Sequence, residues 1–240
     1  MPHQESSFMS IVSSIRKQIT PIHPEGFLFV AGAVVLALAA DWLLPRVGWV
    51  FWLLPLFVAY FFRDPKRVTP LREGLVVSPA DGRVSFVGHA VPPPELGLGD
   101  QPMLMISIFL SVFDVHINRA PVSGRIRRIV YTPGLFLNAD LDKASKDNER
   151  NSLVIESSSG LIGCVQIAGL IARRILCFVK EGEEITAGAR FGLIRFGSRT
   201  DIYVSADARA LVTEGQRAIG GETVLVDLKS SEPQRNFRLD

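Results

Sequence analysis

The stretch RRILCFVKEGEEITAGARFGLIRFGS, residues 173–198, shows the pattern that decides the fold. Short apolar runs alternate with glycine-containing turns, and the 3.6-residue period of a long helix is missing. The same texture extends from residue 68 to residue 228, for example in LVVSPADGRVSFVG and PMLMISIFLSVFDVHI. We therefore predict a mainly β domain over residues 68–228, folded as a compact antiparallel barrel or sandwich.

Two segments inside this region share one shape. VKEGEEITAG (179–188) and VTEGQRAIGGE (212–222) each place an apolar residue shortly before a Glu-Gly pair and a glycine shortly after the next apolar residue. We interpret them as two similar hairpin turns rather than as a tandem sequence repeat. A long irregular segment, residues 132–150, interrupts the strands, and such loops in compact domains are usually functional or mobile.

The N-terminal region, residues 1–67, has a different character. Two apolar blocks, residues 27–45 and 49–62, are separated by only Arg46-Val47-Gly48. The first block is close to the roughly 20 residues that a membrane-spanning helix needs, and no signal-peptide cleavage site follows it. We predict a membrane-associated helical hairpin before the β domain, and a polar tail over residues 229–240.

Basic residues flank the hairpin on both sides. Because cytoplasmic flanks of membrane helices are rich in Lys and Arg, both ends of the hairpin are expected in the cytoplasm. The flanking residues are Arg16 and Lys17 before the hairpin, and Arg63, Lys66 and Arg67 after it. The competing interpretation is a re-entrant or interfacial pair of helices, because Asp41 and the short second block weaken a full span.

A short amphipathic helix is one interpretation of the segment before the hairpin, and a loosely ordered terminus is the other. Apolar residues there recur at helical spacing, which suits a helix lying on a bilayer surface. These residues are Phe8, Ile11, Val12, Ile15 and Ile19, and Pro21 follows them.

Composition excludes several classes of function. The formal net charge of +2, without a basic stripe, argues against a nucleic-acid partner. Cys164 and Cys177 lie in apolar runs without metal-ligand spacing, so we expect buried reduced thiols, no disulfide and no metal site. That usage fits a cytoplasmic domain.

Three positions in the β domain could carry chemistry. Asp81 follows a strand in SPADGRV, His116 ends an apolar run beside Asn118 and Arg119, and Ser198 follows Gly197 in FGSR. Each has an ordinary explanation: an Asp-Gly turn, a core histidine and a tight turn. Supplied by separate strands, however, Asp81, His116 and Ser198 can form a triad in which the imidazole removes the hydroxyl proton. By itself the triad is a weak signal.

The order of four motifs is more specific. PADGRV, DVHINRAPVSG, KASKDNERN and FGSR, behind an apolar hairpin, closely resemble the short-form phosphatidylserine decarboxylase family, including its archaetidylserine-acting relatives. The resemblance covers residues 27 to 228. It implies a pyruvoyl-dependent decarboxylase that converts phosphatidylserine to phosphatidylethanolamine and carbon dioxide through a Schiff base.

The resemblance also implies self-cleavage between Gly197 and Ser198. Ser198, deprotonated by His116 with Asp81 behind it, would attack the Gly197 carbonyl and form an ester. Elimination and hydrolysis would then turn Ser198 into the pyruvoyl group at the start of the α chain, leaving residues 1–197 as the β chain. The two chains would form an α/β heterodimer, open to further oligomerisation, on the cytoplasmic face of the inner cell membrane.

Further residues match the family's substrate-side motifs. Arg199 completes the short-form GSR pattern, and its nearness to the pyruvoyl group suggests contact with the substrate carboxylate or phosphate. The loop that carries the NER motif is expected to act as a lid or to bind the head group. The other expected substrate-binding residues are Lys143, Asn148, Glu149, Arg150 and Arg119.

Other classes of protein remain alternatives on the sequence alone. A membrane-anchored binding or assembly module would have no chemistry in its β domain. A serine peptidase would keep Ser198 as its nucleophile, and a soluble pyruvoyl amino-acid decarboxylase would have little use for the hairpin. Release of a short C-terminal fragment would distinguish the self-processing enzymes from the other two.

Overall fold

A computed structural model of the chain describes residues 20–134, 148–169, 174–195, 197–233 and 235–238. The chain divides into two compact units, Met1–Lys66 and Arg67–Asp240. This boundary lies one residue before the predicted one. The predicted amphipathic helix over residues 8–19 and most of the 132–150 loop lie outside the described residues.

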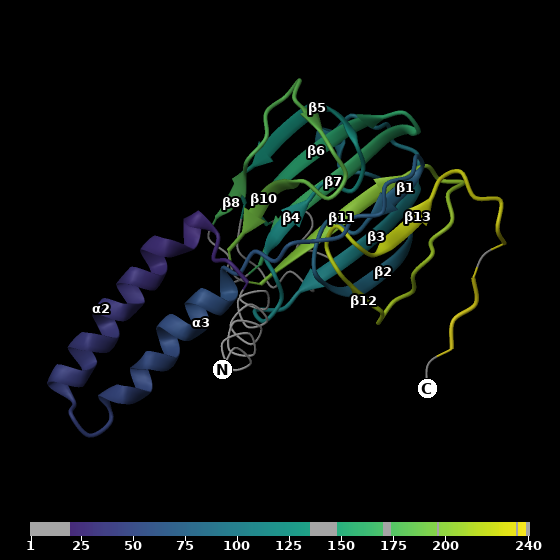
Figure 1. The fold of residues 1–240 in the computed structure, drawn as a ribbon. Helices are drawn as coiled ribbons and strands as arrows, with labels where there is room; N and C mark the ends of the chain where they lie inside the picture. Colours follow the sequence, from purple (N-terminus) through teal and green to yellow (C-terminus); the bar gives the residue numbers. More distant parts are fainter. Residues whose placement is uncertain (1–19, 135–147, 170–173, 196, 234, 239–240) are drawn as a thin grey trace, which may run out of the picture. The chain divides into compact units, whose positions relative to one another are not determined.

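The described part of the first unit is helical (Figure 1). Its elements are η1 (Pro24–Gly26), α2 (Phe27–Leu43), η2 (Gly48–Trp52) and α3 (Leu53–Phe61). The second apolar block is thus only partly α-helical, and Pro55 falls in the first turn of α3, where a missing N–H breaks no helical hydrogen bond. Among the described residues, one helical stretch, Pro24–Leu43, is long and apolar enough to cross a membrane.

Packing within this unit uses small residues. Ala33, Ala37 and Ala40 are the buried residues of α2, at spacings that place them on one side of the helix. A side chain at Gly48 would come within 2.5 Å of the Ala40 carbonyl oxygen, so the chain needs glycine there. The Trp52 indole donates a hydrogen bond of 2.7 Å to Asp41, which provides a partner for a carboxylate between apolar blocks.

The second unit consists of strands. Their bounds are β1 (Leu75–Val77), β2 (Gly82–Ala90), β3 (Met103–Leu110), β4 (Ile117–Arg119), β5 (Gly124–Thr132), β6 (Arg150–Ser157), β7 (Gly160–Ala168), β8 (Ile175–Cys177), β9 (Glu184–Ile185), β10 (Arg190–Ile194), β11 (Ser198–Val204), β12 (Arg217–Ala218) and β13 (Val224–Asp227), with a short helix, η3 (Pro94–Leu96). The strands form an eight-stranded sheet in the order β12-β2-β3-β11-β7-β6-β5-β9, a three-stranded sheet β4-β10-β8 and the pair β1-β13 (Figure 1). Every described strand pair is antiparallel, which confirms the predicted fold class.

The large sheet is buried on both faces near its centre. Alternation along β11 places Ile202 and Val204 in the main core, while Tyr203 packs on the opposite face, where Leu96 covers it. Ser198 and Thr200 share the face of Ile202, because residues two apart in a strand point the same way. The start of β11 therefore brings a hydroxyl group into the interior of the domain.

The strand order repeats about the central pair, β11 and β7. Moving outward, β3 corresponds to β6, β2 to β5, and the edge strand β12 to β9. The two short edge strands come from VTEGQRAIGGE and VKEGEEITAG, so the stretches that look alike in the sequence occupy equivalent places. Their turn glycines match in backbone angle, with φ of 84° at Gly215 and 85° at Gly182. The domain is thus built from two similar halves.

Two smaller predictions have different outcomes. Cys164 and Cys177 are both free thiols, as predicted, but only Cys164 is buried. Cys177 is the last residue of β8 and is exposed. The described tail residues have no regular structure, although the Glu232 carbonyl accepts a 2.6 Å hydrogen bond from Arg209.

Candidate active site

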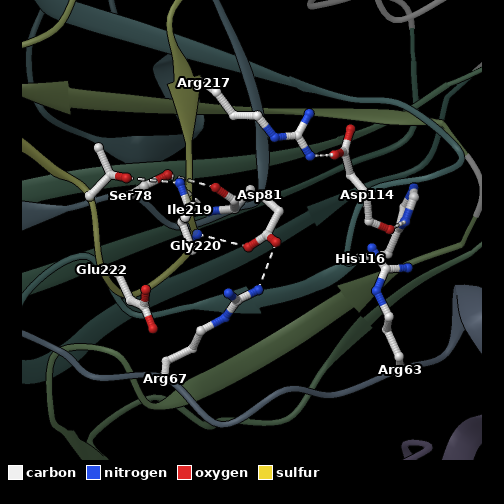
Figure 2. Close-up of polar contacts among 12 residues, drawn as sticks. Arg63, Arg67, Ser78, Asp81, Asp114, His116, Arg217, Ile219, Gly220 and Glu222 are labelled. Carbon is white, nitrogen blue, oxygen red and sulfur yellow. Dashed lines mark hydrogen bonds and ion pairs between the residues drawn. The ribbon is translucent and has the colours of Figure 1, made fainter. Parts of the chain in front are cut away.

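Asp81 lies in the turn that leads into β2, and its carboxylate is held on both oxygens. The Gly220 amide donates to Oδ1 at 2.8 Å, and Arg67 Nη2 lies 2.6 Å from Oδ2 (Figure 2). Burial raises the pKa of this carboxyl group, whereas Arg67 and the Gly220 amide oppose that rise, and Asp114 adds to it. The site therefore contains a desolvated acid whose charged form depends on its neighbours.

His116 is fully buried between β3 and β4. Its Nδ1 lies 3.0 Å from the backbone carbonyl oxygen of Asp114 (Figure 2). A carbonyl can only accept, so Nδ1 carries the hydrogen, and in the neutral ring Nε2 keeps the lone pair. That tautomer leaves Nε2 as the basic nitrogen.

The Asp114 turn that supplies this carbonyl is itself fixed. The Asp114 carboxylate accepts hydrogen bonds from the Ser111 amide at 2.8 Å and the Ser111 hydroxyl at 2.7 Å. It also pairs with Arg217 from β12. Asp114 was not identified from the sequence as part of the site, although it begins the quoted motif DVHINRAPVSG.

Ser198 begins β11, between Leu110 at the end of β3 and Ala168 at the end of β7. The side chain is fully buried, and in the described part of the chain its Oγ has no hydrogen-bond partner. An unsatisfied buried hydroxyl is costly and calls for an explanation. Gly197 precedes it with φ of +61°, a conformation that favours glycine.

The Gly197 carbonyl oxygen accepts a hydrogen bond of 2.9 Å from the Gly169 amide. A backbone N–H aimed at a carbonyl oxygen polarises the C=O bond and stabilises negative charge that develops on the oxygen. The peptide bond between Gly197 and Ser198 therefore has a buried hydroxyl on one side and a hydrogen-bond donor at its oxygen.

Asn118 links the three segments that carry Asp81, His116 and Ser198. Its Nδ2 lies 3.5 Å from both the Pro79 carbonyl oxygen and Thr200 Oγ1. Pro79, Asn118 and Thr200 each lie two residues from one of the three predicted site residues. The Ile194 amide also donates to the His116 carbonyl at 3.3 Å. These contacts bring the three segments together, while direct contact among the three side chains stays a prediction.

A buried row of amides continues from Asn118. Gln166 Nε2 donates to Asn118 Oδ1 at 2.7 Å, and Asn151 Nδ2 donates to Gln166 Oε1 at 2.8 Å. Thr200, Gln166 and Asn151 are register neighbours on β11, β7 and β6. All of these side chains are buried, so the network fixes the strands around Ser198 by satisfied polar contacts. Asn118 and Asn151 lie in two of the motifs quoted above, but nothing in the sequence showed that they form a row with Gln166 and Thr200.

Arg199 points away from Ser198. Neighbouring residues of a strand face opposite sides, and the buried Arg199 guanidinium pairs with Asp201 at 2.9 Å and 3.0 Å. Substrate contact by Arg199 stays a prediction.

The NER residues bind the backbone near Ser198. Asn148 donates from Nδ2 to the Ala168 carbonyl at 2.7 Å. Glu149 accepts the Ala168 amide on its carbonyl oxygen at 2.9 Å and the Ile175 amide on Oε1 at 3.1 Å. Arg150 pairs with Glu95. These contacts support the strand next to Ser198, and the predicted head-group role of the motif is untested.

The remaining predicted substrate residues are Arg119 and Lys143. Arg119 donates from Nη1 to the Gly188 carbonyl at 2.8 Å. Lys143 lies outside the described residues. Within the described ranges, no group of three or more His, Cys, Asp or Glu side chains could hold a metal ion.

Comparison with known proteins identifies the family. The family model described as phosphatidylserine decarboxylase matches residues 54–226. The phosphatidylserine decarboxylase proenzyme of Beijerinckia indica subsp. indica is 59% identical over 230 residues, which cover 96% of this chain and 99% of the relative. The chain therefore belongs to the phosphatidylserine decarboxylase family.

Proposed function

We propose that this chain cuts its own backbone between Gly197 and Ser198, with Ser198 as nucleophile, His116 as base and Asp81 as the supporting carboxylate. The observation that carries the proposal is the buried Ser198 hydroxyl, beside a carbonyl whose oxygen accepts the Gly169 amide. As a member of its family, the chain is a self-processing, pyruvoyl-dependent phosphatidylserine decarboxylase, a carboxy-lyase made as a proenzyme.

The first step of processing follows from this arrangement. His116 Nε2 takes the proton of Ser198 Oγ, and the oxygen forms a bond to the Gly197 carbonyl carbon. Negative charge collects on the Gly197 oxygen, where the Gly169 amide stabilises it at the observed hydrogen bond. The C–N bond then breaks, and the imidazolium returns its proton to the Ser198 nitrogen. The product is an ester that joins residues 197 and 198.

Asp81 supports this step electrostatically. A carboxylate near an imidazole stabilises the positive charge that the ring acquires when it accepts a proton. The Asp114 carbonyl holds the ring in the tautomer with a basic Nε2, so orientation of the ring and stabilisation of its charge come from different residues. Both must be in place before Ser198 reacts.

The residues at Ser198 also fit the pyruvoyl group that the family derives from serine. The Ser198 side chain has no hydrogen-bond partner among the described residues, so its chemical conversion breaks no described contact. The group supplies an electron sink for loss of carbon dioxide, which natural side chains lack. Strands β3 and β7 hold residue 198 on both sides, and His116 is the candidate group for moving protons there.

Membrane attachment follows from the substrate. A lipid head group reaches an enzyme only at the bilayer surface, and the apolar stretch Pro24–Leu43 provides an anchor there. We place the second unit on the cytoplasmic face of the inner cell membrane because basic residues flank the hairpin. Phosphatidylserine in the bilayer and the two products of self-cleavage are then the partners of the site.

Mass spectrometry of the purified chain tests the proposal. We expect a C-terminal fragment that begins at position 198 with a blocked, ketone-bearing residue instead of a serine amine. Ser198→Ala should leave the chain whole. Ser152→Ala is the matched control, because Ser152 is also a buried serine of the same sheet whose hydroxyl has no partner in the described part of the chain.

Ser152→Ala should process as the parent chain does. A fragment that starts elsewhere, or cleavage that survives Ser198→Ala, would refute the assignment of the cut. Carbon dioxide release from serine phospholipids by fully uncut protein would refute the need for processing.

A further inference from the structure

The two halves of the β domain contain the same turn twice, with different side chains. Asp81-Gly82-Arg83 leads into β2, and Ser123-Gly124-Arg125 leads into the equivalent strand β5. A side chain at Gly82 would come 2.1 Å from the Phe109 carbonyl oxygen, and one at Gly124 would come 2.2 Å from that of Glu156. The two turns therefore approach their neighbouring strands in the same way.

The hydrogen bond that closes each turn is also the same. The Gly220 amide donates to Asp81 Oδ1 at 2.8 Å, and the Ala187 amide donates to Ser123 Oγ at 2.9 Å. Gly220 and Ala187 hold equivalent places beside the edge strands β12 and β9. An uncharged serine is thus sufficient to close this turn, and the fold does not require a carboxylate or a cation there.

The Asp81 turn adds a second contact. Arg67 places Nη2 2.6 Å from Asp81 Oδ2, and both side chains are only 12% exposed (Figure 2). We propose that Arg67 is a positioning residue for self-processing, whose function is to keep the buried Asp81 carboxylate charged and directed into the site. The inference rests on the function proposed above for Asp81.

Electrostatics supports this role. The charged groups that act on Asp81 are Arg67, which favours the carboxylate, and Asp114, which disfavours it. The Asp114 carboxylate itself pairs with Arg217 and accepts hydrogen bonds from the Ser111 amide and hydroxyl. Burial raises the pKa of Asp81 even with Arg67 present, so loss of the guanidinium would raise it further. A protonated Asp81 could not stabilise an imidazolium.

By sequence alone, Arg67 belongs with the basic residues that flank the hairpin. The structure separates it from its neighbour, because Lys66 is exposed whereas the Arg67 side chain is largely buried against Asp81. The adjacent pair therefore offers a matched comparison. Lys66→Gln removes one positive charge from the same flank without touching Asp81.

The test follows processing of Arg67→Gln and Lys66→Gln, made by cell-free translation with vesicles of anionic phospholipid. Samples are taken over time across acid to alkaline pH and separated on gels. We expect the acid limb of the Arg67→Gln processing profile to move up by about 1 to 3 pH units. On the acid limb this slows cleavage by about tenfold for each pH unit of displacement, and alkaline pH restores it. Arg67→Lys should recover most of the rate, and Lys66→Gln should match the parent.

A double-mutant cycle separates charge support from a merely structural role. Asp81→Asn slows processing, and adding Arg67→Gln to it should cause no further loss. If the two substitutions reduce the processing rate independently, the inference is wrong. The same holds if the pH profile of Arg67→Gln coincides with the parent profile. Neither result affects the Ser198 assignment. If Arg67→Gln fails to fold, as judged by circular dichroism, the shift must appear to a smaller degree in Arg67→Lys. An Asp81→Asn chain that processes normally would instead refute the proposed function.

Discussion

The two halves of the β domain differ most clearly in what fills equivalent core positions. The row that crosses β11, β7 and β6 beside Ser198 is polar, whereas the equivalent row, which crosses β7, β11 and β3, is aliphatic. By strand register, Asn118, Asn151, Gln166 and Thr200 correspond to Val76, Leu104, Val204 and Ile162. All four aliphatic residues belong to the main core. Apolar side chains are therefore sufficient for the fold at these positions, and we infer that the buried amides organise the candidate site.

The ends of equivalent strand pairs also differ between the two halves. In one half, Ser157 pairs with Gly160 across a tight hairpin between β6 and β7. In the other, Leu110 pairs with Ser198, and the chain reaches Ser198 from β10 instead of turning directly from β3. The bond proposed for cleavage thus lies where the second half has an ordinary hairpin. Asp81 precedes and Ser198 begins a strand of one half, and Gln166 and Asn151 belong to strands of the other, so the internal control for each residue is the equivalent position in the opposite half.

The largest expected effect comes from converting the Asp81 turn into its counterpart. Asp81→Ser keeps an oxygen for the Gly220 amide but removes the carboxylate. Processing should slow by about a hundredfold to ten-thousandfold, the usual range for loss of such a group. In an uncut Ser198→Ala background that also carries Arg67→Gln, so that no buried guanidinium is left unpaired, the free energy of unfolding in urea should change by about 1 kcal/mol or less. A severe loss of stability would show instead that the carboxylate holds the turn.

Gly197 and Gly160 form the next comparison. Both have positive φ, 61° and 113°, and a Cβ at either position would meet open space. Alanine at each should cost about 1 kcal/mol through backbone strain. Only Gly197→Ala should also slow processing, by about tenfold to a hundredfold, because relief of that strain moves the carbonyl away from the Gly169 amide. Equal processing rates in the two variants, measured on gels, would contradict this.

A smaller effect is expected at Thr200. Thr200→Val introduces the kind of side chain that the other half uses, and removes the hydroxyl that Asn118 contacts. We expect processing to slow by about tenfold, with the urea midpoint in the Ser198→Ala background nearly unchanged. Thr200→Ser retains the oxygen and should process at close to the parent rate. If Val and Ser behave alike, the Asn118 contact does not position β11.

The smallest effect concerns stability and pH. The pKa of Asp81 is raised by burial, so the folded chain holds this proton more firmly than the unfolded chain does. Its stabilising contribution is complete at acid pH and is lost as pH rises through the folded pKa. In the Ser198→Ala background, Asp81→Asn should therefore gain stability relative to its parent toward neutral pH. The gain should be about 1.4 kcal/mol for each pH unit that separates the folded from the unfolded pKa, measured by urea unfolding. Ser123→Ala should show no such trend.

Much of the fold was predictable from local sequence. Alternating apolar residues and turn glycines predicted antiparallel strands, and the two similar Glu-Gly stretches proved to be the equivalent edge strands. The pairing of β11 with β7 and β3 was not predictable, because it joins residues far apart in the chain. The polar row follows from that pairing, so Gln166 and Thr200 looked like isolated polar residues in the sequence.

The candidate site shows the same limits. The motifs supplied Asp81, His116, Gly197 and Ser198, but the neighbours that set their charge or orientation belong to other segments. From the sequence, Arg67 belongs with the basic residues that flank the hairpin, because a sequence does not show which contacts a basic side chain makes. Arg199 is a different case. The two-residue period of a strand is enough to place it opposite Ser198, and that period can be read from the residues themselves.

The position of Ser198 between two neighbouring strands has a consequence for the life of the protein. A chain cut at the proposed bond has a C-terminal piece that begins with a strand in the middle of the large sheet, so only noncovalent contacts would hold the two pieces together. A molecule that later melts must reunite two separate polypeptides to recover, and that search becomes slower with dilution. After cleavage, the lifetime of the folded protein therefore depends on how slowly its two pieces separate.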